Sequence, residues 1–269
     1  MEILIGLSDK LNNLMRGKNE LRLLDLMAGI LIGVSPIIHL IIVKKVNVPY
    51  GRFSSSSWGF LINVRVAWFL QEIPALTIPL YTLFTSPTDI TPASLILIGL
   101  FIFHYAHRTL IYPFKIRGGK PTPISIAVLA CIFCTYNGYM QSMFLLHHSN
   151  YSMDWIYQPN FIIGICLFAW GMKTNMICDS ILRNLRKPGE TGYKIPKGDM
   201  FEYVSCGNLF GETVEWLGFA IASWSLQAAA FAVFALLYLS ARSYTNHQWY
   251  IKKFEDYPKD RKIFIPYLI

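Results

Sequence analysis

Ionisable and amide side chains occur inside segments that are otherwise apolar. Glu72 follows Gln71 in the stretch AWFLQEIP, residues 67–74, and Arg65 lies seven residues before Glu72. A carboxylate in hydrocarbon costs at least ~2.5 kcal/mol, so such a residue faces a bundle interior, pairs with another group or holds a proton. Glu72 therefore either makes a structural polar contact that locks helix packing, with Arg65 two turns before it on the same stripe, or serves a polar group of a ligand in a buried pocket.

Polar residues at helical spacing recur in three further apolar segments. Side chains three or four residues apart lie on one face of a helix, so each group can form a continuous polar stripe. The stripes are Asn175, Asp179, Arg183 and Arg186; Asn208, Glu212 and Glu215; and His104 and Tyr105 with Arg108. Several stripes end near loops that contain Lys and Arg. The pattern predicts a polar cavity whose basic mouth binds phosphate groups.

Such a cavity suits two classes of protein. One is a transporter or channel for an anion, and the other is an enzyme that takes an anionic cofactor from the cytoplasm and an apolar substrate from the bilayer. Transporters often contain repeated halves with broken helices, and no internal repeat is visible, which favours the enzyme. The motif G-x-G-x-x-G after a strand is absent, so any dinucleotide would be bound by the helices themselves.

Metal binding is the less favoured interpretation of the cysteines and histidines. Cys131 and Cys134 have the spacing of half a zinc site, but no second pair accompanies them, so we interpret them as buried apolar residues. His104 and His107 lie three apart without a third ligand near in sequence, and we interpret them as hydrogen-bonding helix residues. We therefore predict no metal site.

Membrane-spanning helices are the elements that must position these residues. Only 15% of the 269 residues are charged and 54% are hydrophobic, whereas a soluble domain has about 25% charged residues; the mean hydropathy is +0.39. About 20 apolar residues cross a bilayer as a helix. We expect an all-α, multi-pass integral membrane bundle of seven transmembrane helices, forming one domain over residues 1–269. The expected spans lie near residues 22–43, 57–82, 92–113, 121–147, 159–181, 201–224 and 226–242.

Loop charges predict the orientation of the bundle. Lys and Arg are concentrated in loops 108–120 and 183–197 and in the tail after residue 242, whereas loops 83–91 and 148–158 contain none. The positive-inside rule then places the C-terminus in the cytoplasm and the N-terminus outside. It also explains most of the net charge of +8 without a nucleic-acid partner.

The N-terminal residues do not resemble a cleavable signal. The first 20 residues mix polar and apolar types and lack an apolar core followed by a cleavage site, so the first span is expected to direct insertion itself. We expect the endoplasmic reticulum as the host membrane in a eukaryote and the inner membrane in a bacterium. The expected neighbours are membrane lipids, and the expected state is a monomer.

Five blocks of sequence resemble one known family. They are AWFLQEIP at 67–74, HYAHRTLIYP at 104–113, LRKPGETGYKIPKG at 185–198, GNLFGETVEWLGFA at 207–220 and WYIKKFEDYPKDRKIFIPYLI at 249–269. In this order and spacing they resemble the steroid 5α-reductase family, over nearly all of the chain from about residue 60. The resemblance implies a seven-helix membrane reductase that uses NADPH to reduce the Δ4 double bond of a 3-oxo-Δ4-steroid. Hydride is added at C5 and a proton at C4.

The resemblance also implies roles for individual residues. Glu72 and Tyr105 would polarise the steroid carbonyl, with Trp68 and Gln71 beside the substrate. A carboxyl in an apolar pocket can hold its proton and donate a hydrogen bond, and losing one such donor would cost ~3 kcal/mol. The implied NADPH contacts are Asn175, Asp179, Arg186, Tyr193, Asn208, Glu212, Arg242, His247 and Tyr250, with Arg117 and Lys120 near the phosphates.

The chain departs from the family pattern at a few positions. Asn246 stands where the family has a histidine, and Lys194 and Lys120 stand where it often has arginine, with a glycine inserted in loop 117–120. Lysine lacks the bidentate fork of arginine, which could soften recognition of a 2′-phosphate, but we still expect NADPH rather than NADH. The alternatives are a same-fold reductase of a polyprenol or enoyl thioester, and an anion-handling membrane protein without chemistry.

Overall fold

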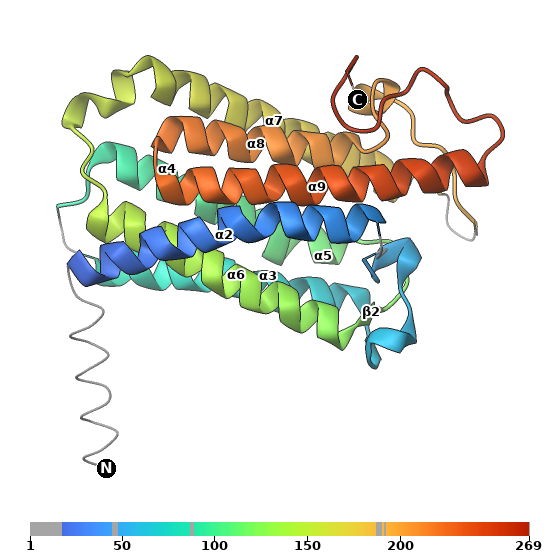
Figure 1. The fold of residues 1–269 in the computed structure, drawn as a ribbon, viewed down its shortest axis with the longest axis horizontal. Coiled ribbons are helices and arrows are strands. Elements are labelled where there is room, and N and C mark those ends of the chain that lie inside the picture. Colours follow the sequence, from blue (N-terminus) through green and yellow to red (C-terminus); the bar gives the residue numbers. More distant parts are fainter. Residues whose placement is uncertain (1–17, 45–47, 87–88, 187–189, 191, 269) are drawn as a thin grey trace, which may run out of the picture.

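The chain folds into a bundle of long helices that lie roughly along one axis (Figure 1). The structure is a computed structural model and describes residues 18–44, 48–86, 89–186, 190 and 192–268. The helices are α2 (Lys18–Lys44), α3 (Val64–Thr85), α4 (Pro92–Ala106), α5 (Tyr112–Lys115), α6 (Ile124–Met143), α7 (Pro159–Asn184), α8 (Gly207–Ser223) and α9 (Leu226–Lys253).

Within the described residues the bundle consists of seven helical segments, because α4 and α5 are joined into one segment. A π-helical turn, His107–Ile111, joins α4 to α5, and a second one, Phe144–His148, extends α6. Within the described residues, five segments are long and apolar enough to cross a membrane: Lys18–Lys44, Pro92–Lys115, Ile124–His148, Pro159–Asn184 and Leu226–Lys253. The other two are α3, which carries Gln71 and Glu72, and α8, which has 17 residues. The prediction of an all-α multi-pass membrane bundle is confirmed.

Three predicted boundaries were wrong. The second helix begins at Val64, not 57, because Leu61–Ile62 (β1) pairs antiparallel with Thr122–Pro123 (β2) and Asn63 caps the helix. The sixth begins at Gly207 after an irregular segment, not at 201. The seventh continues to Lys253, not 242. Hydropathy falls at Arg242, but the helix continues because its polar residues are buried against other segments.

The basic loops lie at one end of the bundle. Segments 48–63, 116–123, 192–206 and 254–268 lie at the end that contains β2 and the C-terminus, and the turns around 89–91, 149–158 and 224–225 lie at the other (Figure 1). This alternation matches the distribution of loop charges. Which end faces the cytoplasm stays a prediction, and the expectation for the N-terminal segment lies in residues 1–17, outside the described residues.

Glycines bring α7 and α8 into close contact. A Cβ on Gly171 would lie 2.6 Å from the Gly211 carbonyl oxygen, and a Cβ on Gly211 would lie 2.6 Å from the Asn175 nitrogen, although real Cβ contacts essentially never fall under 3.0 Å. Small residues let helix backbones approach in membranes, where van der Waals packing drives association. The polar stripes of α7 and α8 flank these glycines, so close packing brings the stripes together.

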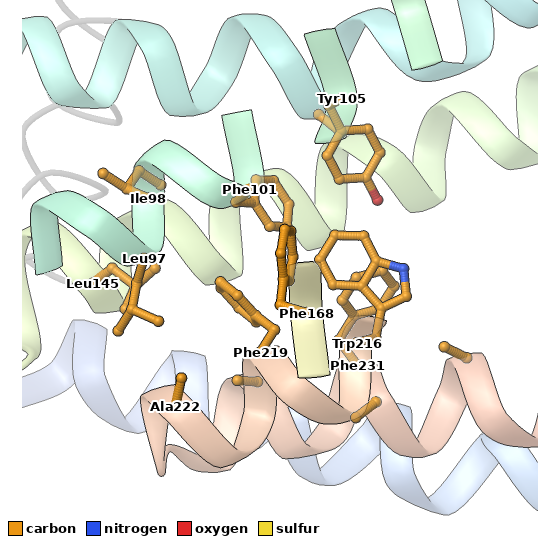
Figure 2. Close-up of a cluster of buried hydrophobic side chains, with 14 of the residues drawn as sticks. Leu97, Ile98, Phe101, Tyr105, Leu145, Phe168, Trp216, Phe219, Ala222 and Phe231 are labelled. Atoms are coloured by element: carbon orange, nitrogen blue, oxygen red, sulfur yellow. The ribbon is translucent and has the colours of Figure 1, made fainter. Parts of the chain in front are cut away.

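An aromatic cluster fills the centre of the bundle (Figure 2). The Trp216 ring lies 4.5 Å from that of Phe231 and 5.8 Å from that of Phe101, centroid to centroid, and Phe101 lies 4.7 Å from Tyr105. Tyr105 is at the edge of this cluster, and its hydroxyl points away from the aliphatic side formed by Leu97 and Leu145 (Figure 2). The packed rings therefore fix where the Tyr105 hydroxyl lies.

Candidate active site

A large cavity lies beside the aromatic cluster. It has a volume of ≈ 540 Å³ and is lined by residues of α2, α3, α4, α6, α8 and α9, which is within the range of about 300–1,000 Å³ of ligand pockets. Most of the lining is apolar. The polar lining side chains include Gln71, Glu72, His104, Tyr105, Arg108 and Glu212.

Glu72 and Tyr105 line the same cavity, from two different helices. Trp68 and Gln71 line it as well, so the structure brings together all four residues expected near the substrate. Glu72 accepts a hydrogen bond from the Cys134 thiol, with 3.8 Å between Oε2 and Sγ. Arg65 is not its partner, because the Arg65 guanidinium donates to the Ile116 carbonyl at 2.8 Å instead.

Close packing of α3 and α6 explains why Cys134 lies next to Glu72. Gly138 faces the α3 backbone, since a Cβ there would lie 3.1 Å from Ala75 Cα and 3.3 Å from the Pro74 carbonyl oxygen. Cys134 is four residues before Gly138, on the same face of α6. It therefore faces the preceding turn of α3, which carries Glu72.

The π-helical turn places several polar residues of the fourth segment in the interior. His107, Arg108 and Thr109 are consecutive and all buried, so this part of the segment faces the interior over a broad arc. Single π-turns within α-helices are frequent at functional sites. Here the turn directs Arg108 toward the cavity that Tyr105 lines one turn earlier.

Arg108 connects the cavity to α7. Its guanidinium lies 4.5 Å from the ring centroid of Trp68 and 4.6 Å from that of Tyr112. It also donates to Asp179, with 3.4 Å between Nη1 and Oδ2. The sequence placed Arg108 in a polar stripe but did not assign it to a ligand, and its central position follows only from the packing.

Four of the expected cofactor residues form one hydrogen-bonded network between α7 and α8. Asn175 Nδ2 donates to the Asn208 carbonyl oxygen at 3.0 Å and to Glu212 Oε2 at 3.4 Å. Asn208 Nδ2 donates to Asp179 Oδ1 at 3.0 Å. Because Glu212 lines the cavity and Asp179 accepts from Arg108, the network begins and ends at the cavity wall.

His104 is held by a carboxylate. Its Nδ1 lies 2.7 Å from Glu215 Oε1, and both side chains are buried. Among the described residues, no group of three His, Cys, Asp or Glu side chains is arranged to hold a metal ion. The pairing agrees with the interpretation of His104 as a hydrogen-bonding helix residue.

Three arginines at the basic end of the bundle each have one buried, unpaired nitrogen. The Nη1 atoms of Arg52, Arg183 and Arg242 are buried and have no hydrogen-bond partner among the residues that the structure describes. A buried unpaired donor of a charged group costs well over 1 kcal/mol. Guanidinium groups are the side chains best suited to hold phosphate oxygens, so this end fits an anionic ligand.

Aromatic rings hold two of these arginines in place. The Arg242 guanidinium lies 3.9 Å from the Tyr50 ring centroid. Arg52 lies 4.3 Å from the Trp249 ring and 4.6 Å from the Tyr250 ring, and donates to the Tyr250 hydroxyl at 3.1 Å. Tyr50 lines the cavity, so the arginine cluster is continuous with it. Burial raises the pKa of the Tyr50 hydroxyl while Arg242 opposes the shift, which keeps this hydroxyl protonated at neutral pH.

Arg52 is a functional candidate that sequence reasoning missed. The sequence placed it in a loop of positive charge, and nothing local distinguishes it from the other basic loop residues. Tyr193 and Tyr250 were expected at the cofactor, and both lie against Arg52, at 5.4 Å and 4.6 Å. Sequence reasoning also missed Arg183 as a functional candidate, because it placed this residue only in a polar stripe. Its guanidinium lies 6.0 Å from the Tyr112 ring.

The remaining expected basic residues lie around the same end. Lys120 Nζ donates to the Arg52 carbonyl at 3.2 Å, and Arg117 donates to Asn184 Oδ1 at 3.0 Å. Arg186 is exposed and donates to the Gly192 carbonyl at 3.3 Å. Asn246, the departure from the family pattern, is buried on α9 one turn after Arg242.

His247 has a different environment. Its Nδ1 lies 2.5 Å from Ser205 Oγ, which is also 2.7 Å from the Tyr257 hydroxyl. Ser205 Oγ further contacts the Lys262 carbonyl oxygen at 3.2 Å. In the described part of the chain, His247 is not among the cavity-lining residues, and it holds the C-terminal tail against the segment before α8.

Known proteins match this chain over most of its length. The family model described as 3-oxo-5-alpha-steroid 4-dehydrogenase matches residues 120–269. The 3-oxo-5-alpha-steroid 4-dehydrogenase 1 of Rattus norvegicus is 49% identical over 254 residues, covering 93% of this chain and 97% of the relative.

Two human relatives give the same result. The Homo sapiens type 1 protein is 50% identical over 227 residues, covering 84% of this chain and 88% of the relative. The Homo sapiens type 2 protein is 45% identical over 208 residues, covering 77% of this chain and 82% of the relative. By these matches, the chain belongs to the 3-oxo-5-alpha-steroid 4-dehydrogenase family, the steroid 5α-reductases.

Proposed function

We propose that the cavity is the active site at which this protein reduces the Δ4 double bond of a 3-oxo-Δ4-steroid with NADPH. One observation carries the proposal: Glu72 and Tyr105, from different helices, line one apolar cavity, and Tyr50 in its wall contacts Arg242, one of three arginines that each have a buried, unpaired nitrogen. An oily ketone and a polyanionic nucleotide need these two environments side by side. The family membership supports the reaction class.

The steroid carbonyl is bound between Glu72 and Tyr105 in this proposal. The apolar lining takes the ring system, and Trp68 and Gln71 flank the carbonyl end. Negative charge grows on the carbonyl oxygen as hydride reaches C5, so two donors aimed at that oxygen stabilise the transition state more than the ground state. Each donor is worth ~3 kcal/mol by comparison with an oxyanion hole.

The residues present fit NADPH. When bound, NADPH supplies the hydride. The amides and carboxylates of Asn175, Asn208 and Glu212 offer donors and acceptors for the nicotinamide amide and ribose, and the network fixes their orientation. The unpaired guanidinium nitrogens of Arg52 and Arg242 offer sites for phosphate oxygens, including the 2′-phosphate.

The departures from the family pattern leave this assignment intact. Lys194 is paired with Glu190 four residues before it, on an exposed segment. Lys120 donates to the backbone of Arg52, so it supports the arginine rather than replacing it. We therefore expect NADPH to bind more tightly than NADH.

The orientation follows from where the cofactor is available. The basic end faces the cytoplasm, where NADPH is available, and the steroid enters from the bilayer. The membrane is the endoplasmic reticulum in a eukaryotic host and the inner membrane in a bacterial one. All residues of the proposed site come from one chain, so a monomer suffices.

Detergent-purified protein tests the proposal. NADPH oxidation should depend on added testosterone or progesterone and should yield the 5α-reduced 3-oxo product, identified by mass spectrometry and chromatography. Parallel reactions contain a polyprenol or an enoyl thioester in place of the steroid. Oxidation only with one of these lipids would replace the steroid assignment, and failure to bind NADPH would refute the proposal as a whole.

A further inference from the structure

We propose that Asn137 is a positioning residue of the reduction. Its amide N–H donates to the oxygen of Tyr105 and thereby commits the Tyr105 O–H to the substrate carbonyl. The inference rests on the role of Tyr105 in the proposed function. It concerns a polar residue of α6 that lies beside the Tyr105 side chain.

Asn137 lies completely buried in the middle of α6. Its side chain lies beside that of Tyr105, but no hydrogen bond joins them, because Nδ2 has no hydrogen-bond partner within 3.5 Å in the described part of the chain. An unsatisfied buried donor costs about 1–3 kcal/mol. The oxygen of the adjacent phenol is the acceptor that a small shift of either side chain would supply.

Hydrogen bonds of Gln141 determine which end of the Asn137 amide is the oxygen and which is the nitrogen. Gln141 Nε2 donates to the carbonyl oxygen of Gln227 at 2.9 Å, and a carbonyl oxygen can only accept, so the nitrogen end of Gln141 must lie there. The second N–H of Gln141 donates to Asn137 Oδ1 at 3.2 Å. With its oxygen held by Gln141, Asn137 presents its nitrogen to Tyr105.

The far end of this chain of amides is also anchored. Gln227 Nε2 donates to Asp25 Oδ1 at 2.8 Å, which ties the start of α9 to α2. Gln141 and Gln227 are each 1% exposed, so water does not compete for these bonds. The orientation of the Asn137 amide is therefore set by contacts among three helices.

A phenol oxygen that accepts a hydrogen bond from an N–H group keeps its own O–H free to donate to a different acceptor. Asn137 presents N–H to Tyr105, so the Tyr105 hydroxyl accepts on that side and donates on the other, toward the cavity. Hydrogen bonds in a chain polarise one another, so accepting from Asn137 makes the Tyr105 O–H a stronger donor. The effect grows with the charge on the carbonyl oxygen, and it should change kcat rather than substrate affinity.

A double-mutant cycle tests the inference. Asn137→Asp keeps the size of the side chain but presents an oxygen to Tyr105, which competes for the phenol proton. We expect kcat to fall about tenfold, the effect of one hydrogen bond of roughly 1.4 kcal/mol, with an unchanged KM for steroid and Kd for NADPH. In the Tyr105→Phe background the same substitution should have no further effect on kcat.

A second variant guards against a folding defect in the first. Gln141→Leu removes the donor that fixes the Asn137 amide and, with it, the bond to the Gln227 carbonyl oxygen, so its melting temperature is measured with its kcat to separate a loss of stability from a loss of rate. It should lower kcat about threefold, again only when Tyr105 is present. Ser142→Ala is the control, because Ser142 is buried on the same helix but donates to the Gly138 carbonyl at 2.7 Å; its kcat should match that of the wild type.

Each alternative outcome is decisive. Equal losses in both backgrounds would mean that Asn137 acts through packing, and no loss in the wild-type background would remove it from the reaction. Both results overturn the inference and leave the proposed function standing. If Tyr105→Phe alone turns over as fast as the wild type, the role of Tyr105 is wrong and the inference falls with it.

Discussion

Replacing Gly211 with alanine should separate α7 from α8 and weaken cofactor binding. The new Cβ would lie 2.6 Å from the Asn175 backbone nitrogen, 2.9 Å from the Gly171 carbonyl oxygen and 3.0 Å from Thr174 Cβ. Ordinary contact begins at 3.4 Å, so the helices must move apart by up to 0.8 Å at this point. Two of these neighbours are backbone atoms and cannot rotate away.

The displacement exceeds what the polar network tolerates. The bond from Asn175 Nδ2 to the Asn208 carbonyl is 3.0 Å long and that to Glu212 is 3.4 Å, and an N–H···O contact of about 3.6 Å is no longer a hydrogen bond. Overpacking costs about 1–3 kcal/mol and each lost bond about 1 kcal/mol. The higher helix propensity of alanine returns about 1 kcal/mol. The net destabilisation is about 2–4 kcal/mol.

Thermal melting in detergent and NADPH titration by fluorescence measure the two effects. We expect a lower melting temperature and an NADPH Kd raised at least about tenfold, since 1.4 kcal/mol corresponds to a factor of ten. Gly99→Ala is the matched control: a Cβ at Gly99 in α4 would meet no described atom within 4 Å. Its melting temperature should be equal to or above that of the wild type, because alanine favours the helix without a clash, and its Kd should be unchanged.

The comparison between the two alanine variants tests both the tight α7–α8 contact and the role of the polar network in cofactor binding. If Gly211→Ala melts and binds NADPH like Gly99→Ala, the α7–α8 contact is not as tight as the geometry requires. If Gly211→Ala is destabilised but binds NADPH normally, the packing argument holds and the network between Asn175, Asn208 and Glu212 is not part of the cofactor site.

Three further sets of variants test the proposed roles. Glu72→Gln and Tyr105→Phe should each lower kcat about 100-fold with NADPH affinity retained, because each weakens a donor at the carbonyl oxygen; steady-state rates near those of the wild type would contradict this. Arg52→Met keeps a flexible, unbranched side chain but removes the charge, and should raise the NADPH Kd at least about tenfold. An unchanged Kd excludes Arg52 from the phosphate site. Arg186→Ala should raise that Kd only about threefold, because exposed charges interact weakly; a loss larger than that of Arg52→Met would reverse their ranking.

Much of the site could be predicted from the sequence because membrane burial makes polar residues conspicuous. A carboxylate such as Glu72 is expensive in hydrocarbon, so its presence in an apolar run already indicates a bundle interior. Helical spacing then grouped Asn175 with Asp179 and Asn208 with Glu212, and the structure joins these pairs by hydrogen bonds. The basic loops, read by charge alone, lie together at one end.

Other features were not predictable because they depend on contacts between distant segments. Arg52 looked like any loop cation, and its burial among Tyr193, Trp249 and Tyr250 arises from the return of α9 beside the loop after α2. His247 is predicted at the cofactor, and its contact with Ser205, which also contacts Tyr257 of the tail, depends on the tertiary structure. The π-helical turn that buries Arg108 has no local sequence signal that we recognised.

The sequence alone determined that this protein is a helical membrane bundle with a polar interior. Hydropathy, helical spacing and loop charge are local properties, and they set how each segment partitions between water and lipid. The tertiary structure alone decided which polar groups share a cavity and which stabilise the fold. Glycine contacts bring α7 to α8 within backbone distance, and Gly138 brings α6 to α3. Such pairings depend on the shapes of packed surfaces, which no single segment contains.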